Sequence, residues 1–76
     1  MNLLFTTKTC PNCPAAEKVL QDHGVEYEKI YAEDKTELAS YYGVMSVPTL
    51  ITDDADLLTG VSEIIRFAEE QSFPQF

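Results

Sequence analysis

Short apolar segments alternate with polar stretches along the chain and predict four strands. The first, Asn2–Thr6, is apolar and ends at a polar cluster, as expected of a buried strand. The second, Val25–Tyr31, is rich in β-branched and aromatic residues. Thr49–Thr52 and Asp56–Leu58 are two further short strands, and the turn-forming residues 53–55 between them predict a hairpin.

Helical spacing appears between and after these strands. In the first helix, the residues that share one face fall at i, i+1, i+4, i+5 and i+8. Gly24 is placed to end this helix. A second helix is predicted to begin at Asp34, which makes a capping-box-like pair with Glu37, and to end at Gly43. Ser62 suits the first turn of a third helix. The residues on the three helix faces are Ala15, Ala16, Val19, Leu20 and His23, then Leu38, Tyr41 and Tyr42, then Val61, Ile64, Ile65 and Ala68.

These elements follow one another in the order β-α-β-α-β-β-α. A helix that connects two strands usually makes a right-handed crossover, so the first two strands should be parallel. The sequence holds no internal repeat, low-complexity tract or linker. It therefore predicts an α/β fold, a mixed four-stranded sheet with three helices, built as a single domain over residues 1–76.

Composition narrows the classes of partner. Of the 76 residues, 45% are hydrophobic, which is enough for a globular core. The formal net charge is −8, with 13 acidic against 5 basic residues, so nucleic acids and anionic membranes would be repelled. The same charge favours a partner with a basic docking face, although it also serves simply to keep a small protein soluble.

The sequence also bears on location. No apolar run approaches the length of a membrane span. The run LLF at residues 3–5 is too short for a signal peptide and lacks a basic flank. We therefore expect a cytoplasmic monomer that binds neither membrane nor nucleic acid.

The stretch TTKTCPNCP, residues 6–14, holds the only two cysteines, Cys10 and Cys13. A disulfide that closes so short a loop stabilises little, because loop-closure entropy grows with loop length. Such a bond is better explained as one that opens and closes in a redox cycle. We predict a redox-active Cys10–Cys13 disulfide that needs no bound cofactor, since the pair itself carries two electrons.

The two cysteines are predicted to have different roles in thiol–disulfide exchange. Cys10 is placed where the first helix begins, and there unpaired backbone N–H groups and the helix dipole favour the nucleophilic thiolate. Cys13 lies one helical turn further on and should be less exposed, which suits a resolving cysteine. Lys8 either adds a positive charge near Cys10 or is only a solvated loop charge.

Two prolines bracket this motif. Pro11 fits the first helical position, where its missing N–H is no loss. Pro14 removes an amide further along and biases Cys13 away from helical geometry. The sequence leaves two alternatives open: the helix begins near Asn12, or its first turn is irregular.

A C-x-x-C pair also serves as half of many zinc sites. Here no second pair exists, and the only histidine, His23, falls at the predicted end of the helix. Four ligands for a structural zinc ion cannot be gathered within one chain, so no metal site is predicted. An iron–sulfur cluster held between two subunits through Cys10, together with glutathione or without it, stays an alternative.

Taken with the order of elements, KTCPNC at residues 8–13 and SVPTL at residues 46–50 carry a family resemblance. The chain resembles the thioredoxin superfamily and, within it, the short glutaredoxins and glutaredoxin-like redoxins, over nearly all its length. The resemblance implies a dithiol–disulfide oxidoreductase that reduces protein disulfides, with a cis Pro48 facing the cysteines. Such a bond leaves the backbone of Val47 free to pair with a substrate strand. The residues implied to contact substrate are Lys8, Pro11, Asn12, Val47, Pro48, Thr49, Gly60 and Ser62.

Departures from the family pattern bear on the reductant. Glutaredoxins that use glutathione typically carry C-P-Y-C, and Asn12 stands at the tyrosine position here. They also carry a Gly-Gly-x-Asp-like element before the last helix, where this chain has Thr59 for one glycine and Ser62 for the aspartate. Gly60, Ser62 and the helix N-terminus could still bind a carboxylate. Because a charge of −8 does little to attract anionic glutathione, thioredoxin reductase or another flavoprotein is the favoured reductant and glutathione the less favoured.

Related groups supply further alternatives. Ribonucleotide-reductase-associated redoxins have a similar size but usually a different sequence before the last helix. The run CPNCP resembles the amino-terminal domain of alkyl-hydroperoxide-reductase flavoproteins and archaeal glutaredoxin-like disulfide reductases. A non-catalytic adaptor with this fold is disfavoured by the two intact cysteines.

Overall fold

The computed structural model describes residues 2–72, which form four strands and three helices in the predicted order. The elements are β1 (Asn2–Thr6), α1 (Cys13–Asp22), β2 (Tyr27–Tyr31), α2 (Thr36–Tyr42), β3 (Thr49–Ile51), β4 (Leu57–Thr59) and α3 (Val61–Ser72). The four strands make one sheet in the order β2-β1-β3-β4. β1 and β2 are parallel, as predicted, while β3 pairs antiparallel with both β1 and β4.

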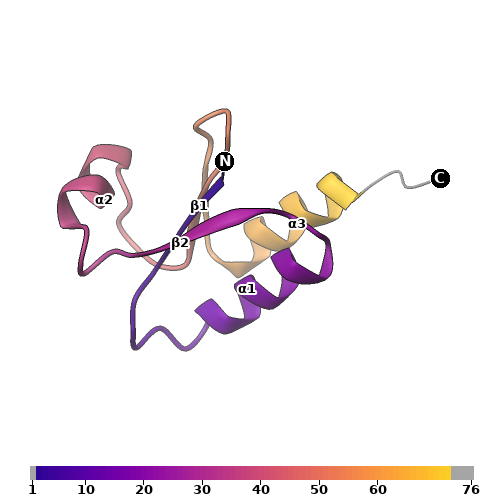
Figure 1. Cartoon of the computed structure of the whole chain (residues 1–76), viewed down its shortest axis with the longest axis horizontal. Helices are drawn as coiled ribbons and strands as arrows, with labels where there is room; N and C mark the ends of the chain where they lie inside the picture. Colours follow the sequence, from indigo (N-terminus) through magenta and orange to yellow (C-terminus); the bar gives the residue numbers. More distant parts are fainter. Residues whose placement is uncertain (1, 73–76) are drawn as a thin grey trace.

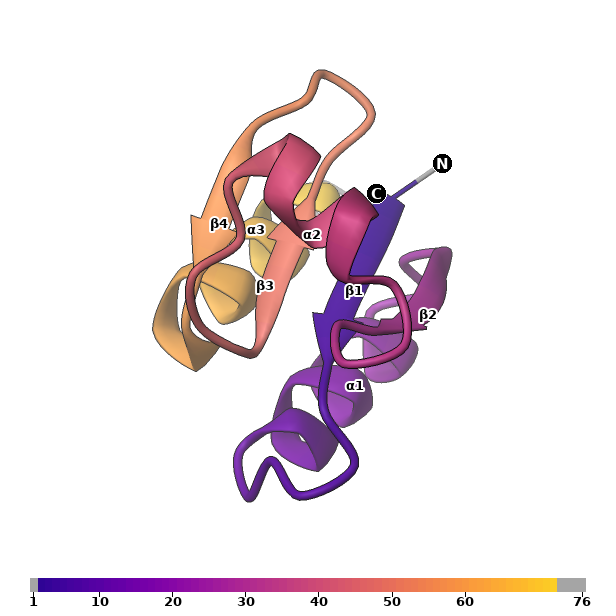
Figure 2. The same cartoon turned by 90° about the vertical axis from the view of Figure 1, so that its left-hand side faces the viewer.

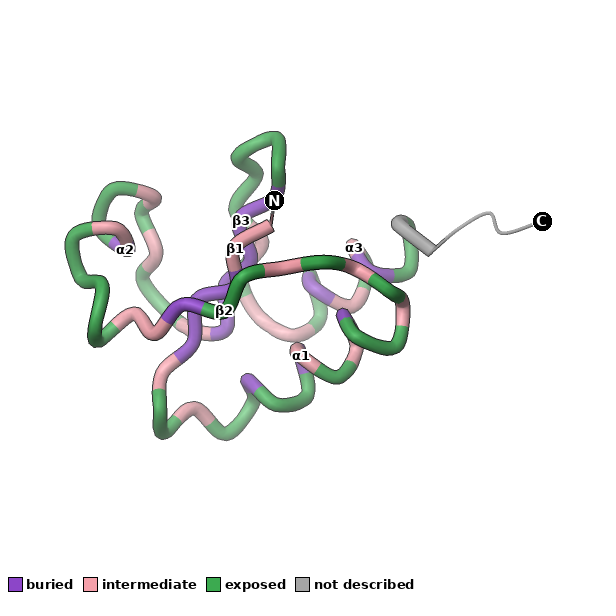
Figure 3. The backbone as a smooth tube through the Cα atoms, in the orientation of Figure 1, coloured by how far each residue is buried: buried purple, intermediate pink, exposed green. Residues whose placement is uncertain are grey.

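Helices cover both faces of this sheet. α1 and α3 lie side by side on one face, and α2 lies on the other (Figures 1 and 2). Because successive side chains of a strand point to opposite faces, Leu4 and Phe5 enter different cores, and so do Leu50 and Ile51. The buried members are Leu4, Ala16, Leu20, Leu50, Ile64 and Ala68 on the face of α1 and α3, and Phe5, Ile30, Ala39 and Ile51 on the face of α2. Figure 3 shows burial concentrated along the central strands and on the inner sides of α1 and α3.

The end of α1 explains why β2 begins two residues later than predicted. His23 is the C-cap, as its predicted place at the helix end implies, and Gly24 follows with a left-handed φ of 70°. The N–H of Val25 then donates to the carbonyl of Leu20 at 2.9 Å. Val25 therefore closes the helix instead of starting the strand.

The predicted capping box of α2 is wrong. The helix begins at Thr36, its N-cap is Lys35, and no side chain caps it. The N–H groups of Asp34 and Lys35 both donate to the carbonyl of Tyr31 at 3.0 Å, so Asp34 belongs to a turn after β2. The C-terminal end is as predicted, because Gly43 adopts the left-handed conformation with a φ of 75°.

The predicted hairpin forms, with shifted strand limits. Thr52 lies outside β3, and its N–H donates to the carbonyl of Asp56 at 3.1 Å. The Thr52 hydroxyl in turn accepts the N–H of Asp56, which holds the base of a three-residue loop. Ala55, the last residue of that loop, has a positive φ of 67°. This arrangement is typical of three-residue hairpin loops, whose third residue is usually left-handed.

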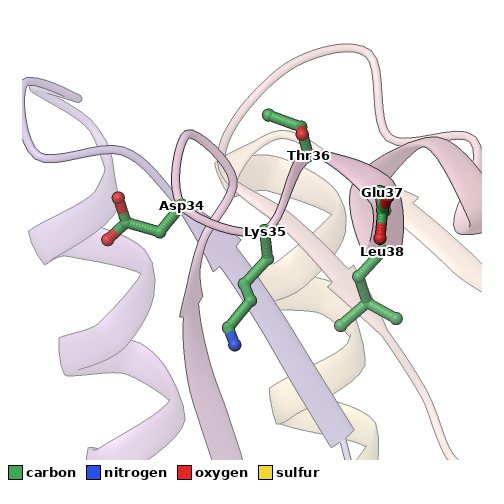
Figure 4. Close-up of a pocket in the computed structure, with 5 residues that line it drawn as sticks. All are labelled: Asp34, Lys35, Thr36, Glu37 and Leu38. Atoms are coloured by element: carbon green, nitrogen blue, oxygen red, sulfur yellow. The ribbon is translucent and has the colours of Figure 1, made fainter.

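A pocket of about 380 Å³ lies where β2 connects to α2 (Figure 4). It is lined by Asp34, Lys35, Thr36, Glu37 and Leu38. The pocket is formed by one continuous segment of chain, so the residues from the cysteine motif take no part in its lining. None of the helices within residues 2–72 has the length and apolar character needed to cross a membrane.

Candidate active site

The two cysteines form a disulfide at the entrance to α1. Cys10 lies in the loop that follows β1, and Cys13 is the first residue of the helix. Their Cα atoms are 5.5 Å apart. Cys13 is only 3% exposed, whereas Cys10 is half-buried. When the bond opens, Cys10 is therefore the sulfur that a large substrate reaches more easily.

The prolines have different places from those predicted. Asn12 is the N-cap of α1, and its carbonyl accepts the first helical N–H, that of Ala16, at 3.3 Å. Pro11 is therefore outside the helix, and the prediction that it takes the first helical position is wrong. Pro14 takes the second position, where the missing N–H has no helical acceptor to lose. Of the two alternatives, a helix that begins beside Asn12 is correct.

The leading end of α1 presents positive potential to the cysteine loop. The first N–H groups of an α-helix have no helical acceptor, and the aligned peptide dipoles add to their effect. The first turn of α1 carries no acidic residue, and the Asn12 side chain makes no capping hydrogen bond. The N–H of Cys10 donates to the carbonyl of Thr7 at 3.4 Å, which folds the loop back toward the end of β1. With neither an acidic residue nor a capping side chain there, the N-terminal end of α1 is open to an anionic sulfur.

Lys8 contacts acidic residues of the turn after β2. Its backbone N–H donates to a carboxylate oxygen of Glu33 at 3.0 Å, and its Nζ lies 3.6 Å from Oδ2 of Asp34. The same Nζ is 5.6 Å from the centroid of the Tyr31 ring. Lys8 therefore ties the cysteine loop to the β2–α2 connection. Its predicted influence on the Cys10 sulfur stays a prediction.

Pro48 lies at the same end of the sheet as the cysteine loop. The Val47–Pro48 peptide is cis, as the family resemblance implied. In the antiparallel ladder Phe5 faces Thr49, and continuing this register by one residue sets Pro48 beside Thr6. Figure 2 shows the loop after β1, the turn before β3 and the start of α3 gathered at this one end.

The turn before β3 is held by its own hydrogen bonds. The hydroxyl of Thr49 donates to the carbonyl of Ser46 at 2.6 Å, and Thr49 is only 1% exposed. The carbonyl of Pro48 accepts the N–H of Gly60 at 2.9 Å. Within residues 2–72, the N–H and carbonyl of Val47 have no hydrogen-bond partner. The backbone of Val47 is therefore unpaired in this turn, whereas the Thr49 side chain maintains the turn.

Gly60 and Ser62 were predicted as carboxylate-binding residues at the start of α3. The Gly60 N–H is already engaged by Pro48, and its carbonyl accepts the N–H of Ile64 at 3.2 Å as the helix begins. Ser62 is exposed in the first turn beside the acidic Glu63, which is also exposed. A bound carboxylate would meet a negative side chain and lose one of the predicted donors.

The described residues hold no group of three or more histidine, cysteine and acidic side chains arranged for a metal ion. The histidine of the sequence caps the C-terminal end of α1, at the opposite end of that helix from the cysteines. A cluster shared between two subunits would use residues from a second chain and stays a hypothesis.

Sequence reasoning missed two residues next to the site. Glu33 binds the backbone of Lys8, and no local pattern predicts a contact across 25 residues. Thr6 is completely buried, and its hydroxyl has no partner within residues 2–72. A signal for Thr6 was present: it is two residues after the core residue Leu4, on the same face of the strand.

Comparisons with known proteins show the family to which the chain belongs. The sequence model of the glutaredoxin family matches residues 2–56, which include both cysteines and Pro48. The thioredoxin of Methanocaldococcus jannaschii is 39% identical over 54 residues, which are 63% of this chain and 64% of that protein. A protein of Archaeoglobus fulgidus named "Probable Thioredoxin" is 36% identical over 70 residues, covering 83% of this chain and 76% of that one.

Solved structures share the fold. The crystal structure of the thioredoxin-like protein BC3987 superposes with a TM-score of 0.74 at 23% identity, covering 93% of this chain and 99% of that one. The solution structure of glutaredoxin from Brucella melitensis gives a TM-score of 0.67 at 20% identity, covering 91% and 78%. At these identities the likeness concerns the fold alone. Because the family model spans the cysteine motif, the cis-proline turn and the first three strands, the chain belongs to the glutaredoxin family, within the thioredoxin superfamily.

Proposed function

We propose that this protein is a dithiol–disulfide oxidoreductase that donates electrons to protein disulfides. The observation that carries the proposal is the Cys10–Cys13 pair, which is bonded, unequally exposed, and placed at the leading end of α1. Unequal exposure separates an attacking sulfur from a resolving one. The cis-proline turn at the same end of the sheet supplies a place for the substrate backbone.

In the first step, the Cys10 thiolate attacks one sulfur of the substrate disulfide. A bond forms between that sulfur and Cys10 while the substrate bond breaks, and the leaving sulfur takes a proton from water. The open N-terminal end of α1 favours the thiolate form of Cys10 before the attack. The product of this step is a mixed disulfide.

In the second step, Cys13 loses its proton and attacks the sulfur of Cys10. The intramolecular disulfide forms, and the substrate leaves with both of its sulfurs reduced. The 5.5 Å between the Cα atoms allows this bond without a large backbone movement. Two electrons have passed from the cysteine pair to the substrate, and an external reductant must restore the pair.

The substrate backbone is proposed to pair with Val47. An extended segment beside this turn can exchange hydrogen bonds with the unpaired Val47 N–H and carbonyl, as a strand added at an edge does. Pro11 and Asn12 are exposed between the cysteines and would contact the same segment. Because Thr49 is buried, its contribution is to hold the turn.

A flavoprotein such as thioredoxin reductase is proposed as the reductant in preference to glutathione. The Gly60 N–H is engaged, Glu63 adds a negative charge at the start of α3, and the net charge is −8. These features disfavour the carboxylates of glutathione. A reducing partner of this kind implies a reducing compartment, so the proposed location is the cytoplasm. Faster turnover with thioredoxin reductase than with glutathione and glutathione reductase is the expected result.

Two single substitutions test the division of roles. Cys10→Ser should abolish reduction of insulin disulfides, because the attacking sulfur is gone. Cys13→Ser should accumulate mixed disulfides with substrates, because nothing displaces the captured protein. Non-reducing gels and mass spectrometry follow both. Full insulin reductase activity in the Cys10→Ser protein would refute the proposal.

A further inference from the structure

The outer side of β4 is an edge of the sheet that no other described strand covers. In the order β2-β1-β3-β4, the last strand pairs with β3 alone. Figure 2 shows β4 on the outside of the sheet, on the far side of β3 from β1. An edge strand presents unpaired N–H and carbonyl groups, which are the groups that a strand of another chain binds.

The register of the hairpin decides which backbone groups of β4 point outward. The N–H of Gly60 donates to the carbonyl of Pro48, so these two residues form a hydrogen-bonded pair. Bonded and non-bonded pairs alternate in an antiparallel ladder, so Leu58 belongs to the next bonded pair, and Leu57 and Thr59 belong to non-bonded pairs. The N–H and carbonyl groups of Leu57 and Thr59 therefore point away from β3, and within residues 2–72 they have no hydrogen-bond partner.

Leu57 adds apolar surface to this edge. Its side chain is 45% exposed, whereas the residue opposite it on β3, Ile51, is only 3% exposed and belongs to the core on the face of α2. Opposed residues share a face of the sheet, so a strand added beside β4 would place a side chain against Leu57 on this same face. An apolar side chain there would extend the core by one residue. The edge thus offers both hydrogen-bonding groups and an apolar contact.

The charge around β4 has a single sign. Residues 36–65 contain no lysine or arginine. The same stretch contains five acidic residues, all exposed: Glu37, Asp53, Asp54, Asp56 and Glu63. Three of them precede β4 in the hairpin loop, and Glu63 follows it in the first turn of α3, so negative charge flanks the edge at both ends. This field attracts a basic segment and repels an acidic one.

The same charge disfavours a second copy of this chain as the occupant. If two β4 strands paired antiparallel, the acidic hairpin loop of one copy would meet the Glu63 end of the other. Like charges placed opposite each other destabilise such a pair. A basic partner has no such cost.

The opposite edge of the sheet, β2, differs in charge and in its side chains. It carries Lys29, whose Nζ lies 3.1 Å from Oε2 of Glu17 and 5.2 Å from the centroid of the Tyr31 ring. A lysine on an edge strand discourages pairing with another strand. The β2 edge therefore lacks both the uniform negative charge and the exposed leucine of β4.

We propose that the edge of β4 binds an extended basic segment of a partner protein, which adds as a fifth strand. Leu57 and Thr59 supply two N–H donors and two carbonyl acceptors, Leu57 supplies the apolar contact, and the flanking carboxylates supply the attraction. The segment that fits carries lysine or arginine alternating with apolar, β-branched residues. Docking on β4 involves neither the cysteines nor the Val47 backbone, so it goes beyond the proposed exchange reaction.

The first test uses three fluorescent peptides and the wild-type protein. One alternates lysine and valine, the second has glutamate for lysine, and the third keeps the lysines but has proline for valine, which prevents strand pairing. Fluorescence anisotropy measures binding at low and high salt. The lysine–valine peptide should bind at least tenfold more tightly than either of the others, and its affinity should fall as salt is added.

Substitutions at the two edges locate the site. Leu57→Pro removes one outward N–H without removing a donor from the ladder to β3, and it should weaken binding about tenfold while insulin reduction stays at the wild-type rate. Asp54→Lys should weaken binding about fivefold at low salt. Glu28→Lys makes the same change of charge on the opposite edge strand and is the matched control, which should change binding less than twofold.

A measurement on the wild-type protein needs no substitution. Amide hydrogen exchange, followed by NMR, should slow at Leu57 and Thr59 when the lysine–valine peptide is added. Three results would overturn the proposal. They are no binding of this peptide at about 1 mM, equal binding of the proline-containing peptide, and protection of other amides instead of Leu57 and Thr59. Self-association of the protein that Leu57→Pro abolishes would also overturn it, because a second copy would then be the occupant.

Discussion

Single residues around the cysteines decide how the motif works. Pro14 and Asn12 fix where α1 begins, which leaves Cys10 outside the helix and Cys13 as its first, buried residue. The sequence alone does not decide whether Pro11 or Pro14 lies in the first turn of the helix, because either proline fits an N-terminal position. The structure settles this at Asn12, whose carbonyl accepts the first helical N–H.

Ala55 allows a prediction about how a single residue affects the stability of the fold. Its φ of 67° lies in the left-handed region, which is unfavourable for a residue with a Cβ atom. Ala55→Gly should raise the free energy of unfolding by about 0.5–1 kcal/mol, net of the greater flexibility of glycine in the unfolded chain. Urea denaturation measures the change. Ala15→Gly on the exposed side of α1 is the control and should lose about 1 kcal/mol. A destabilised Ala55→Gly protein would contradict the positive φ.

At the level of elements, a side-chain cluster joins β2 to α1. Nζ of Lys29 lies 3.1 Å from Oε2 of Glu17, and the hydroxyl of Tyr27 donates to Oε1 of Glu17 at 3.3 Å. The hydrogen bond from Lys29 to Glu17 is the main reason that the pKa of Lys29 is raised above 10.5, and Tyr31 adds to it. The cluster holds the edge strand against the helix that carries the cysteines.

The raised pKa predicts how stability depends on pH. A lysine with a higher pKa in the folded state contributes stability below its unfolded pKa and loses it as the pH rises through the folded value. Lys29→Met should therefore be slightly less stable than wild type at pH 8, and the difference should shrink above pH 10.5. Thermal unfolding at several pH values checks this. Lys18→Met removes an equal charge from an ion pair within α1 and should cost less. A stability difference between wild type and Lys29→Met that grows above pH 10.5 would contradict the prediction.

The elements also show what sequence could and could not predict. The order of elements and the sheet followed from periodicity, and the cysteine pair followed from its spacing. The cis peptide bond at Pro48 was implied only by the family resemblance. The start of α2 did not, because the carboxylate of Asp34 pairs with Lys8 instead of capping the helix. The sequence also could not predict that the N–H of Gly60 is engaged, since this N–H donates to the carbonyl of Pro48 across the hairpin.

On the scale of the whole molecule, the charge of −8 is expected to select substrates. We compare two small disulfides of opposite charge, cystamine and dithiodipropionate, at low and high salt. At low salt cystamine should be favoured, and added salt should lower its rate and raise that of dithiodipropionate. Because salt screens charge, the change in the ratio of the two rates with salt reports the field of the protein independently of the intrinsic reactivities of the two disulfides. A ratio that does not change with salt would exclude electrostatic selection.

The proposed exchange reaction depends on the different reactivity of the two sulfurs. Its most direct test is the pH dependence of alkylation of the reduced protein, with the modified cysteine identified by mass spectrometry. We expect Cys10 to react first, with a pKa below that of an ordinary thiol, about 8.5, and Cys13 to be protected by its burial. Equal labelling of both cysteines, with Cys10 titrating like an ordinary thiol, would contradict the account.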